Sequence, residues 1–330
     1  HARHTTRRGQ VLMHPAVNRM VAPGQKRPRI MRGGIIQIQI TRACDKACHH
    51  CTQGSNLAGK PAMMTVEEFD TACASLEGYQ GVVGVFGGNP ALHPHFDEIC
   101  RIMRARFPLD QRGLWCNNLN GKGAHARVTF QPRHSNLNVH LDGEAHAEFC
   151  RDWPESIPYL KGLEQDSIHG SPWVAMRDVI PDEEQRWNLI ADCDVNRFWS
   201  AALGVIPGRG LRAYFCEIAY AQAALHAVAP DADDWPDTGL PVTPGWWRKP
   251  MADFEAQVNL HCHACGIPLR RPGQLAIGGE HEEFSETHRH IARPKVKGRP
   301  VQIVESIGVV ERPERPSTEY LPNTTPRQRA

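Results

Sequence analysis

Between residues 35 and 204, short apolar runs of strand length alternate with segments of helical periodicity. Six runs have the length and apolar content expected of strands, at residues 35–40, 82–86, 113–116, 137–141, 173–179 and 197–203. Because strand and helix take turns along the chain, this pattern favours repeated βα units with parallel strands over an all-β or all-α domain.

The first two connections carry helix boundary signals. A helix is predicted to begin after Thr65, which has the capping-box spacing to Glu68, and to end at Gly78. A second helix is predicted after the next strand, with an apolar stripe that starts at Phe96 and with Pro108 just after its end. The sequence therefore predicts the order β-α-β-α at the start of the domain.

Three cysteines follow the first predicted strand within one loop. Cys44, Cys48 and Cys51 have the spacing Cys-x3-Cys-x2-Cys, and no fourth cysteine follows in the loop. Proteins that only carry electrons usually hold a four-iron cluster with four cysteines, so three thiolates leave one iron open for chemistry. A zinc site completed by His49, His50 or a distant cysteine is the alternative, because zinc accepts mixed sulfur and nitrogen ligands.

A turn with two glycines follows the second predicted strand, and it consists of Gly87, Gly88, Asn89 and Pro90. Glycine has no Cβ, so the backbone of such a turn can approach a ligand closely. One βα unit separates this turn from the three cysteines. Together the two motifs resemble the radical S-adenosylmethionine (radical SAM) superfamily, in which the turn usually reads Gly-Gly-Glu-Pro.

This resemblance implies a fold, a cofactor and a reaction. The fold is α/β, a partial (β/α)6 TIM-like barrel, and barrel active sites lie where strands end and βα loops begin. In that superfamily three cysteines hold a [4Fe-4S] cluster, and the open iron binds the amino and carboxylate groups of SAM. An electron from the cluster releases a 5′-deoxyadenosyl radical, which removes hydrogen from an unactivated carbon.

The same resemblance assigns further site residues. The turn at residues 87–90 is expected to position the methionine end of SAM, although Asn89 replaces the usual glutamate and carries no charge. Asn117 lies in a segment similar to the third strand end, which faces the cofactor, and a plain Asn- and Gly-rich turn is the alternative. Asp142 and Arg151 resemble the fourth strand end and the arginine after it in the subgroup with SPASM-type extensions.

Four later cysteines form a second candidate metal site: Cys193, Cys216, Cys262 and Cys265. The last two have the Cys-x2-Cys spacing of many metal sites. The set resembles the SPASM or shorter twitch extensions of the superfamily, which hold extra clusters beyond the barrel, and four cysteines suffice for a single auxiliary [4Fe-4S] cluster. A zinc ion on the same ligands, with His261 or His263 among them, is the alternative.

Other cysteines, histidines and tryptophans are expected to be structural. Cys73, Cys100 and Cys150 are predicted to be buried apolar fillers. Trp246 and Trp247 are expected to anchor a Gly- and Pro-rich segment to the barrel, with a substrate-lining role as the alternative. A group of histidines in the tail is expected to be a surface feature: His281, His288 and His290.

The composition suggests four segments in the 330-residue chain. Residues 1–33 form a basic arm without Asp or Glu, expected either to be solvated and poorly ordered or to touch phosphates. Residues 34–204 form the predicted barrel, and residues 205–280 a small metal-binding C-terminal module. Residues 281–330 are rich in Pro and charges and are expected to be a mostly irregular tail, with one strand-like run at 301–304.

The chain is expected to be cytoplasmic. Its 11 cysteines are an odd number, which suits a reducing compartment with metal ligands better than a disulfide framework. No apolar run approaches the roughly 18 residues that span a bilayer, so no membrane association is expected.

The sequence therefore predicts a radical SAM enzyme acting on a peptide, a protein or a small metabolite. Its expected cofactors are a [4Fe-4S] cluster, SAM and a second cluster or zinc, and its expected electron donor is a flavodoxin or ferredoxin. Modification of RNA is an alternative suggested by the basic arm. A non-catalytic zinc-binding interaction protein is the alternative from another class.

Overall fold

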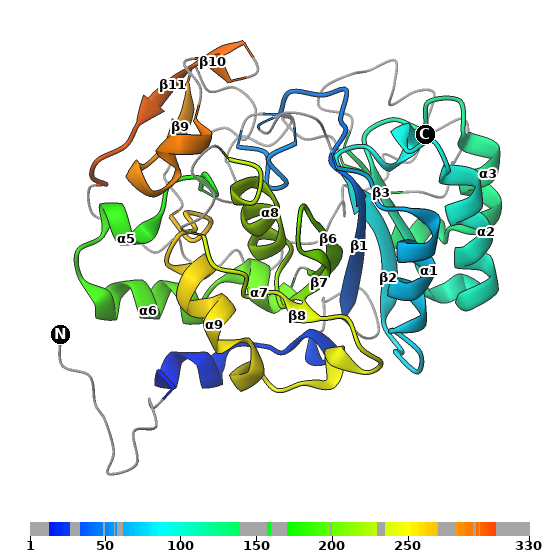
Figure 1. Cartoon of the computed structure of the whole chain (residues 1–330), viewed down its shortest axis with the longest axis horizontal. Coiled ribbons are helices and arrows are strands. Elements are labelled where there is room, and N and C mark those ends of the chain that lie inside the picture. The colour runs from blue at the N-terminus through cyan, green and yellow to red at the C-terminus, as the bar shows by residue number, and fades with distance from the viewer. Residues whose placement is uncertain are drawn as a thin grey trace, which may run out of the picture.

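A computed structural model describes residues 13–26, 34–48, 50–55, 57, 62–138, 157–159, 170–198, 200–229, 235–269, 281–292, 295–296 and 298–307. Its largest element is a sheet with the strand order β5-β4-β3-β2-β1-β6-β7-β8 (Figure 1). The strands are β1 Ile35–Thr41, β2 Val82–Gly87, β3 Arg112–Cys116, β4 Asn136–Asn138, β5 Ile157–Tyr159, β6 Ser200–Ile206, β7 Gly210–Tyr214 and β8 Leu240–Pro241.

The six strands from β5 to β6 are parallel, whereas β7 and β8 are antiparallel to their neighbours. This arrangement confirms the predicted α/β fold of the partial barrel type, and the sheet is not closed into a barrel. The last parallel strand, β6, pairs with β1 rather than with β5. The two segments 34–41 and 200–206 therefore lie side by side at the centre of the sheet.

Two of the predicted strands need correction. The prediction of a strand at 173–179 is wrong, because its second half forms helix α5, Met176–Val179. Its first half is a turn in which the Trp173 ring is fully buried against His288. A short buried apolar run has the same sequence signal in a strand and in a helix. The strand predicted at 197–203 starts only at Ser200, because helix α7, Asp194–Phe198, occupies the residues before it.

Helices cover the two faces of the sheet differently (Figure 1). Helices α1 Val66–Ala74, α2 Phe96–Arg106 and α3 Gly123–Thr129 lie on one side. Helix α8, Glu217–His226, packs on the other face, where the Tyr220 ring lies so close to Gly204 that a Cβ there would be 2.2 Å from it. Because Gly204 pairs with Gln39 of β1, α8 covers the inner face that carries Gln37 and Gln39.

The predicted capping box is present at the start of α1. Thr65 N–H donates to Glu68 Oε2 at 2.8 Å, and Glu68 N–H donates to Thr65 Oγ1 at 3.2 Å. Gly78 has φ +77° in the turn after the helix, a conformation that favours glycine. The local boundary signals therefore act here as the sequence predicts.

The remaining helices are short. The α-helices are α6 Glu183–Ala191 and α9 Glu255–Gln257, and a π-helix, η9, continues α9 over Val258–Cys262. The 3-10 helices are η1 Pro15–Arg19, η2 Pro23–Gln25, η3 Pro90–Leu92, η4 Leu109–Gln111, η5 Pro132–His134, η7 Trp246–Arg248, η8 Met251–Phe254 and η10 Glu286–Ile291. No helix among the described residues is long and apolar enough to cross a membrane.

Part of the basic arm is packed into the protein. Residues 13–26 run along the lower edge in Figure 1, and Ala16, Val17 and Lys26 are buried. Asn196 fixes the backbone here, since its side chain accepts from Val21 N–H at 2.9 Å. The expectation of a solvated arm is therefore wrong for these residues, while residues 1–12 and 27–33 lie outside the described chain.

The two C-terminal segments also differ from expectation. The boundary at residue 204 falls inside β6, and β7 and β8 continue the main sheet, so residues 205–241 are not a separate module there. The tail is not mostly irregular over 281–303, since β9 Glu282–Phe284, β10 Lys295–Val296 and β11 Arg299–Ile303 form a small sheet. The predicted strand-like run at 301–304 lies largely in β11.

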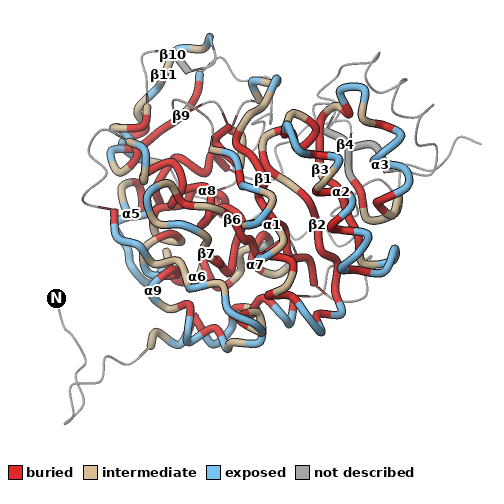
Figure 2. Tube along the Cα trace, turned by 45° about the vertical axis from the view of Figure 1, so that its right-hand side comes forward, coloured by how far each residue is buried: buried red, intermediate tan, exposed pale blue. Residues whose placement is uncertain are grey.

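The hydrophobic core runs through the centre of the sheet. The buried tube in Figure 2 follows β1, β2, β6 and α8. Cys73 and Cys100 are buried in it, as predicted, whereas Cys150 lies outside the described residues. Trp246 is buried in the same core and Trp247 packs edge-on against Tyr79 at 5.1 Å, which supports the predicted anchoring role.

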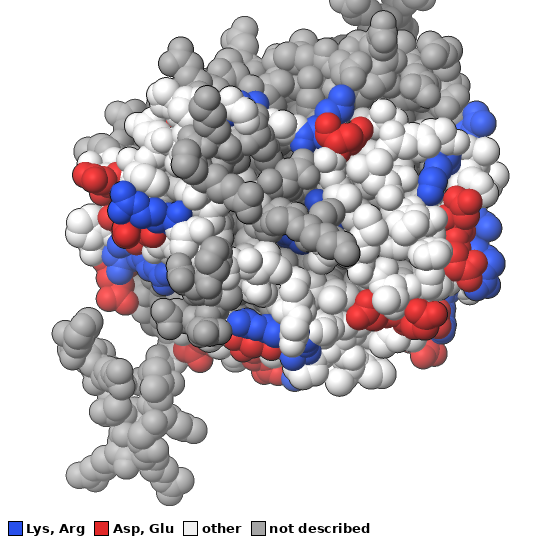
Figure 3. All heavy atoms as spheres, turned by 45° about the horizontal axis from the view of Figure 1, so that its top comes forward, with Lys and Arg blue, Asp and Glu red and all other residues white. Residues whose placement is uncertain are grey.

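Charged side chains of both signs share the surface. On the face shown in Figure 3, lysines and arginines lie in small groups beside acidic residues. Within the described part of the arm, Arg19 is engaged with the protein itself, since its Nη2 donates to Asn188 Oδ1 at 3.3 Å. These contacts do not add support to the RNA alternative.

Candidate active site and a second cysteine group

The cysteine loop, residues 44–51, begins where β1 ends, at the carboxyl edge of the parallel strands. Cys44, Cys48 and Cys51 are all half-buried. Arg42 closes the base of the loop, because its Nη2 donates to Gln53 O at 2.9 Å and to the next carbonyl at 3.2 Å. The three thiols are thus held by one short, internally braced segment.

The glycine turn after β2 lies directly against this loop. Gly88 N–H donates to Thr41 O at 2.9 Å, and Asn89 N–H donates to Ala43 O at 2.7 Å. A Cβ at Gly88 would lie 2.2 Å from Ala43 O and 2.9 Å from Cys44 Cβ. A larger residue than glycine cannot occupy this contact without displacing the loop.

Asn89 is buried and its amide is used within the protein. Its Oδ1 accepts from Ala91 N–H at 3.2 Å and so caps the η3 helix. Its Nδ2 donates to Asp45 Oδ1 at 3.4 Å. The carboxylate of Asp45 therefore lies beside the position of the usual glutamate, and the sequence reasoning missed it although it follows the first cysteine directly.

Asn117 joins the third strand end to the cysteine loop. Its Nδ2 donates to Cys44 Sγ at 3.3 Å. Its Oδ1 is buried and accepts no hydrogen bond from the described residues. Asn117 thus lies beside the first cysteine, and its predicted contact with the cofactor stays a prediction, whereas Asp142 and Arg151 lie outside the described residues.

The small C-terminal sheet also contacts the cysteine loop. His50, which has φ +49°, donates its N–H to Glu282 Oε1 at 3.1 Å, and its Nε2 lies 3.6 Å from Glu283 Oε2. Arg299 donates to Ala47 O at 3.1 Å. His50 is therefore directed to this sheet, which weakens the alternative that it completes a zinc site.

Two aromatic side chains line the inner face of the sheet near the turn. Phe86 and Trp115 are half-buried, and the indole lies across Gly84 and Gly113. A Cβ at Gly84 would be 2.2 Å from the Trp115 ring, so glycine is required beneath it. The sequence reasoning missed both aromatic residues. The sequence of one strand does not indicate which of its two faces lies toward helix α8.

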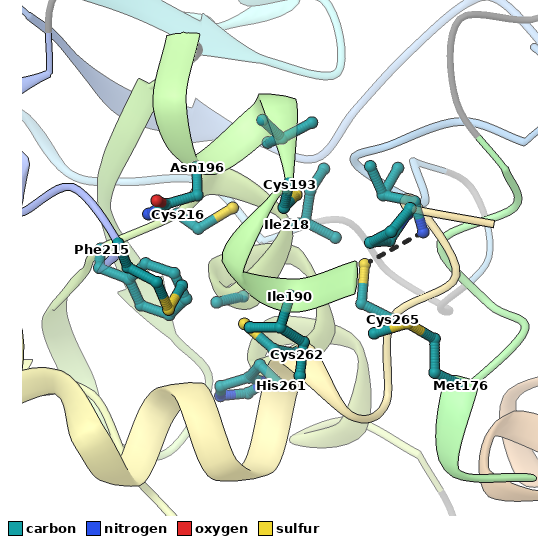
Figure 4. Close-up of a pocket in the computed structure, with 15 residues that line it drawn as sticks. Met176, Ile190, Cys193, Asn196, Phe215, Cys216, Ile218, His261, Cys262 and Cys265 are labelled. Atoms are coloured by element: carbon teal, nitrogen blue, oxygen red, sulfur yellow. Dashed lines mark hydrogen bonds between the residues drawn. The ribbon is translucent and has the colours of Figure 1, made fainter. Parts of the chain in front are cut away.

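The second group of cysteines surrounds one cavity, which we call the cysteine cavity. Figure 4 shows Cys193, Cys216, Cys262 and Cys265 among its lining residues. They come from the α6–α7 connection, the start of α8, the end of η9 and the turn after it. Burial raises the pKa of Cys216 to about 11 and raises the pKa values of Cys262 and Cys265 well above the ordinary thiol value.

The neighbouring histidines are engaged elsewhere. His261 lines the cavity, but its Nδ1 lies 3.1 Å from Gln222 Oε1 and its Nε2 lies 3.0 Å from Thr238 Oγ1. His263 Nδ1 accepts from Arg186 Nε at 3.4 Å. The donor set of the cavity is therefore four thiols rather than a mixture of thiols and imidazoles.

Thiolates are ligands that zinc and iron–sulfur clusters share. Within the described residues, no three Cys, His, Asp or Glu side chains are close enough together to hold one metal ion.

The two groups lie at opposite ends of the central strands. The cysteine loop follows the last residue of β1, whereas Cys216 follows β7, whose end pairs with the start of β6. Gln53, two residues after the cysteine loop, nevertheless reaches the residue next to Cys216, since its Nε2 lies 3.5 Å from Glu217 Oε1. Helix α8 bridges them, because it begins after Cys216 and its Leu225 reaches the position of Gly54 beside Cys51.

A buried chain of histidines supports the cysteine cavity. His290 Nε2 lies 2.7 Å from His226 Nδ1, His226 Nε2 lies 2.9 Å from His288 Nδ1, and His288 donates to Ala264 O at 2.6 Å. His288 is fully buried, so the predicted surface role is wrong for it, although His281 is exposed. The partner His226 is 62 residues away in sequence, which no local pattern reveals.

The comparisons with known proteins agree with the first group of motifs. The family model for the Radical SAM superfamily matches residues 38–171, which include the cysteine loop, the glycine turn and Asn117. No curated protein matches the chain. Among solved structures, the crystal structure of BtrN in complex with AdoMet and 2-DOIA is similar at 10% sequence identity and a TM-score of 0.42, covering 73% of this chain and 96% of that one.

The radical SAM superfamily consists of enzymes that require SAM, an iron–sulfur cluster, a reductant and a substrate. The family match at 38–171 and the α/β sheet identify the same type of domain. The chain contains a radical SAM superfamily domain at residues 38–171, and this match supports an enzyme.

Proposed function

We propose that this enzyme cleaves SAM reductively at a cluster held by Cys44, Cys48 and Cys51. The observation that supports the proposal most is the contact between the cysteine loop and the glycine turn. Two backbone hydrogen bonds join them, and Gly88 leaves no space for a Cβ beside Cys44. A cofactor bound to the three thiols would therefore meet the turn immediately.

The chain supplies the groups that would orient SAM. Residues 87–90 present backbone atoms beside the thiols, and Asp45 supplies the carboxylate that Asn89 lacks. Asn89 holds Asp45 through its Nδ2. We assign the amino group of SAM to this pair, because a carboxylate pairs with an ammonium more strongly than a neutral amide does.

When bound, the cluster supplies the electron that splits SAM into methionine and a 5′-deoxyadenosyl radical. The protein has to orient SAM and exclude water from the radical. Helix α8 and the aromatic rings of Phe86 and Trp115 provide apolar cover on the inner face of the sheet. We propose that Asn117, Asp142 and Arg151 complete this site from the neighbouring strand ends.

The proposed substrate is a peptide or protein side chain or a small metabolite. We further propose that Cys193, Cys216, Cys262 and Cys265 hold an auxiliary [4Fe-4S] cluster. Its place at the amino ends of β1 and β6, opposite the strand end that carries the cysteine loop, favours transfer of electrons over direct binding of the substrate. A flavodoxin or ferredoxin is the proposed source of electrons.

The test is formation of 5′-deoxyadenosine by anaerobically reconstituted and reduced protein. The wild type is expected to convert SAM, and the triple variant Cys44→Ala, Cys48→Ala, Cys51→Ala is expected to give no product. The matched control is Cys73→Ala, Cys100→Ala, which alters two buried cysteines of the core. Equal product from wild type and triple variant would reject the proposal.

A further inference from the structure

Lys26 is a completely buried lysine at the end of the packed N-terminal segment. Its exposed fraction is 0%, and its backbone and Cβ lie against Gly34 at the start of β1. Within the described residues, its Nζ has no hydrogen-bond partner. Burying an ammonium without a partner is costly, so this position calls for a negative group.

Burial lowers the pKa of Lys26, and four nearby groups oppose this shift: Cys216, Glu217, Cys193 and Cys262. The three cysteines among them line the cysteine cavity. The Glu217 carboxylate already accepts hydrogen bonds from Ser200 Oγ and, at 3.5 Å, from Gln53 Nε2. A metal centre on the cysteines would supply further negative charge, because metal ligands are thiolates.

The start of helix α8 adds a second positive feature to the same place. Cys216 is the N-cap of this ten-residue helix. The N-terminus of a helix carries partial positive charge and favours an anion. Lys26 and the start of α8 thus bring positive charge near the four cysteines, and Met20 of the same N-terminal segment lines their cavity.

We propose that Lys26 is the counter-ion of an anionic iron–sulfur centre held by Cys193, Cys216, Cys262 and Cys265, and that it raises the reduction potential of that centre. This inference rests on the proposed auxiliary cluster. Reduction adds one electron to the centre, and a nearby ammonium stabilises the more negative, reduced form. Lys26 is therefore a residue that tunes the second centre without binding it.

The test is a potentiometric titration of wild type and Lys26→Met, followed by the spin signals of the reduced clusters. In Lys26→Met the reduction equilibrium constant of the auxiliary cluster is expected to fall about tenfold, which is about 59 mV for one electron. The potential of the cluster in the cysteine loop is expected to stay unchanged. Lys249→Met is the matched control, because Lys249 pairs with Asp253 near the surface.

A second variant tests the sign of the effect. Glu217→Gln removes a negative charge at the same end of α8, and the auxiliary potential is expected to rise. If Lys26→Met does not bind the second cluster, its potential cannot be measured. Thermal unfolding of the metal-free proteins then provides the test. Metal-free Lys26→Met is expected to melt above metal-free wild type, because the unpartnered ammonium is gone, whereas a purely structural role for Lys26 would lower its melting temperature.

The outcomes separate the inference from the function on which it rests. Two clusters in the wild type with an unchanged auxiliary potential in Lys26→Met would reject the role of Lys26 alone. A wild type with four irons, or with four irons and one zinc, would reject the auxiliary cluster and the inference with it. In either case the proposed cleavage of SAM at the cysteine loop is tested separately, by the 5′-deoxyadenosine assay.

Discussion

The two cysteine groups of this enzyme are built in opposite ways. The cysteine loop carries its three thiols on one segment of eight residues, half-buried at the carboxyl end of β1. The cysteine cavity gathers four thiols from elements spread over residues 193–265, close to the amino ends of β1 and β6. The first group needs only a correct loop, whereas the second needs the whole fold around it.

This difference teaches where each group is vulnerable. Disturbing the loop affects one centre whose parts are neighbours in sequence. Disturbing α8, η9 or the N-terminal segment would affect the proposed second centre, because each contributes residues to the lining of the cavity. Variants can therefore separate the two centres, and the following predictions are arranged by the size of the expected effect.

Loss of one cavity cysteine should give the largest separation of the two groups. Cys265→Ala is expected to remove the whole second metal centre, about half of the iron, while 5′-deoxyadenosine formation without substrate persists. Iron analysis and the SAM cleavage assay on the same sample provide the measurement. Cys100→Ala is the matched control, because Cys100 is buried in the core and touches neither group.

Acid should weaken the surroundings of the second group. Burial lowers the pKa of His288 to about 4, from the ordinary value near 6.5. Between these values the unfolded chain binds more protons than the native one, so the free energy of unfolding falls as pH drops from about 6.5 to 4. The loss is expected to reach about 3 kcal/mol.

Thermal unfolding of the metal-free protein across this pH range measures the effect. His288→Gln is expected to reduce the pH dependence without abolishing it, because burial also lowers the pKa values of His261 to about 3 and of His263 to about 4. Parallel curves for wild type and His288→Gln would show that His288 does not contribute to the effect.

Adding one methyl group to the glycine turn should impair the first group selectively. Gly88→Ala places a Cβ against Ala43 O and Cys44. The dissociation constant for SAM is expected to rise about thirtyfold, or about 2 kcal/mol. Gly121→Ala is the control for backbone strain without a close contact, since Gly121 has φ +74° and no atom lies within 4 Å of the added Cβ there.

Equilibrium binding of SAM to the reconstituted proteins distinguishes these variants. A dissociation constant for Gly88→Ala within twofold of the wild type would mean that the turn does not contact SAM. The auxiliary iron content is expected to stay constant in both variants, which keeps the comparison between the two groups intact.

The smallest effect is expected from the hydrogen bond to the first cysteine. Asn117→Ala removes the donor to Cys44 Sγ, and hydrogen bonds to cluster sulfurs raise the reduction potential. The reduction equilibrium constant of the first cluster is expected to fall about threefold, measured by redox titration. Asn118→Ala is the control, because the Asn118 amide caps the next turn at Asn120 instead; an equal shift in both variants would contradict the prediction.

Sequence alone predicted the parts of the fold that depend on local signals. The capping box at Thr65, the strand before the cysteine loop and the glycine turn all have short-range signatures. The spacing of three cysteines is also local. The resemblance to the radical SAM superfamily could therefore be recognised from residues 44–90.

The rest depends on contacts between distant segments. No periodic pattern of residues predicts the pairing of β6 with β1 or the packing of α8 on the inner face. Lys26 is one of several basic residues in an arm that reads as solvated, and only its burial beside Cys216 and Glu217 distinguishes it. His288 likewise reads as a surface residue until His226 and Trp235 are placed around it.

The N-terminal segment has a consequence for the order of assembly. Met20 lines the cysteine cavity, so residues 13–26 contribute to its wall. If the proposed auxiliary cluster forms there, its iron and sulfide would have to enter before this segment docks. The cysteine loop lies at the opposite end of β1, so docking of the segment would not limit its loading.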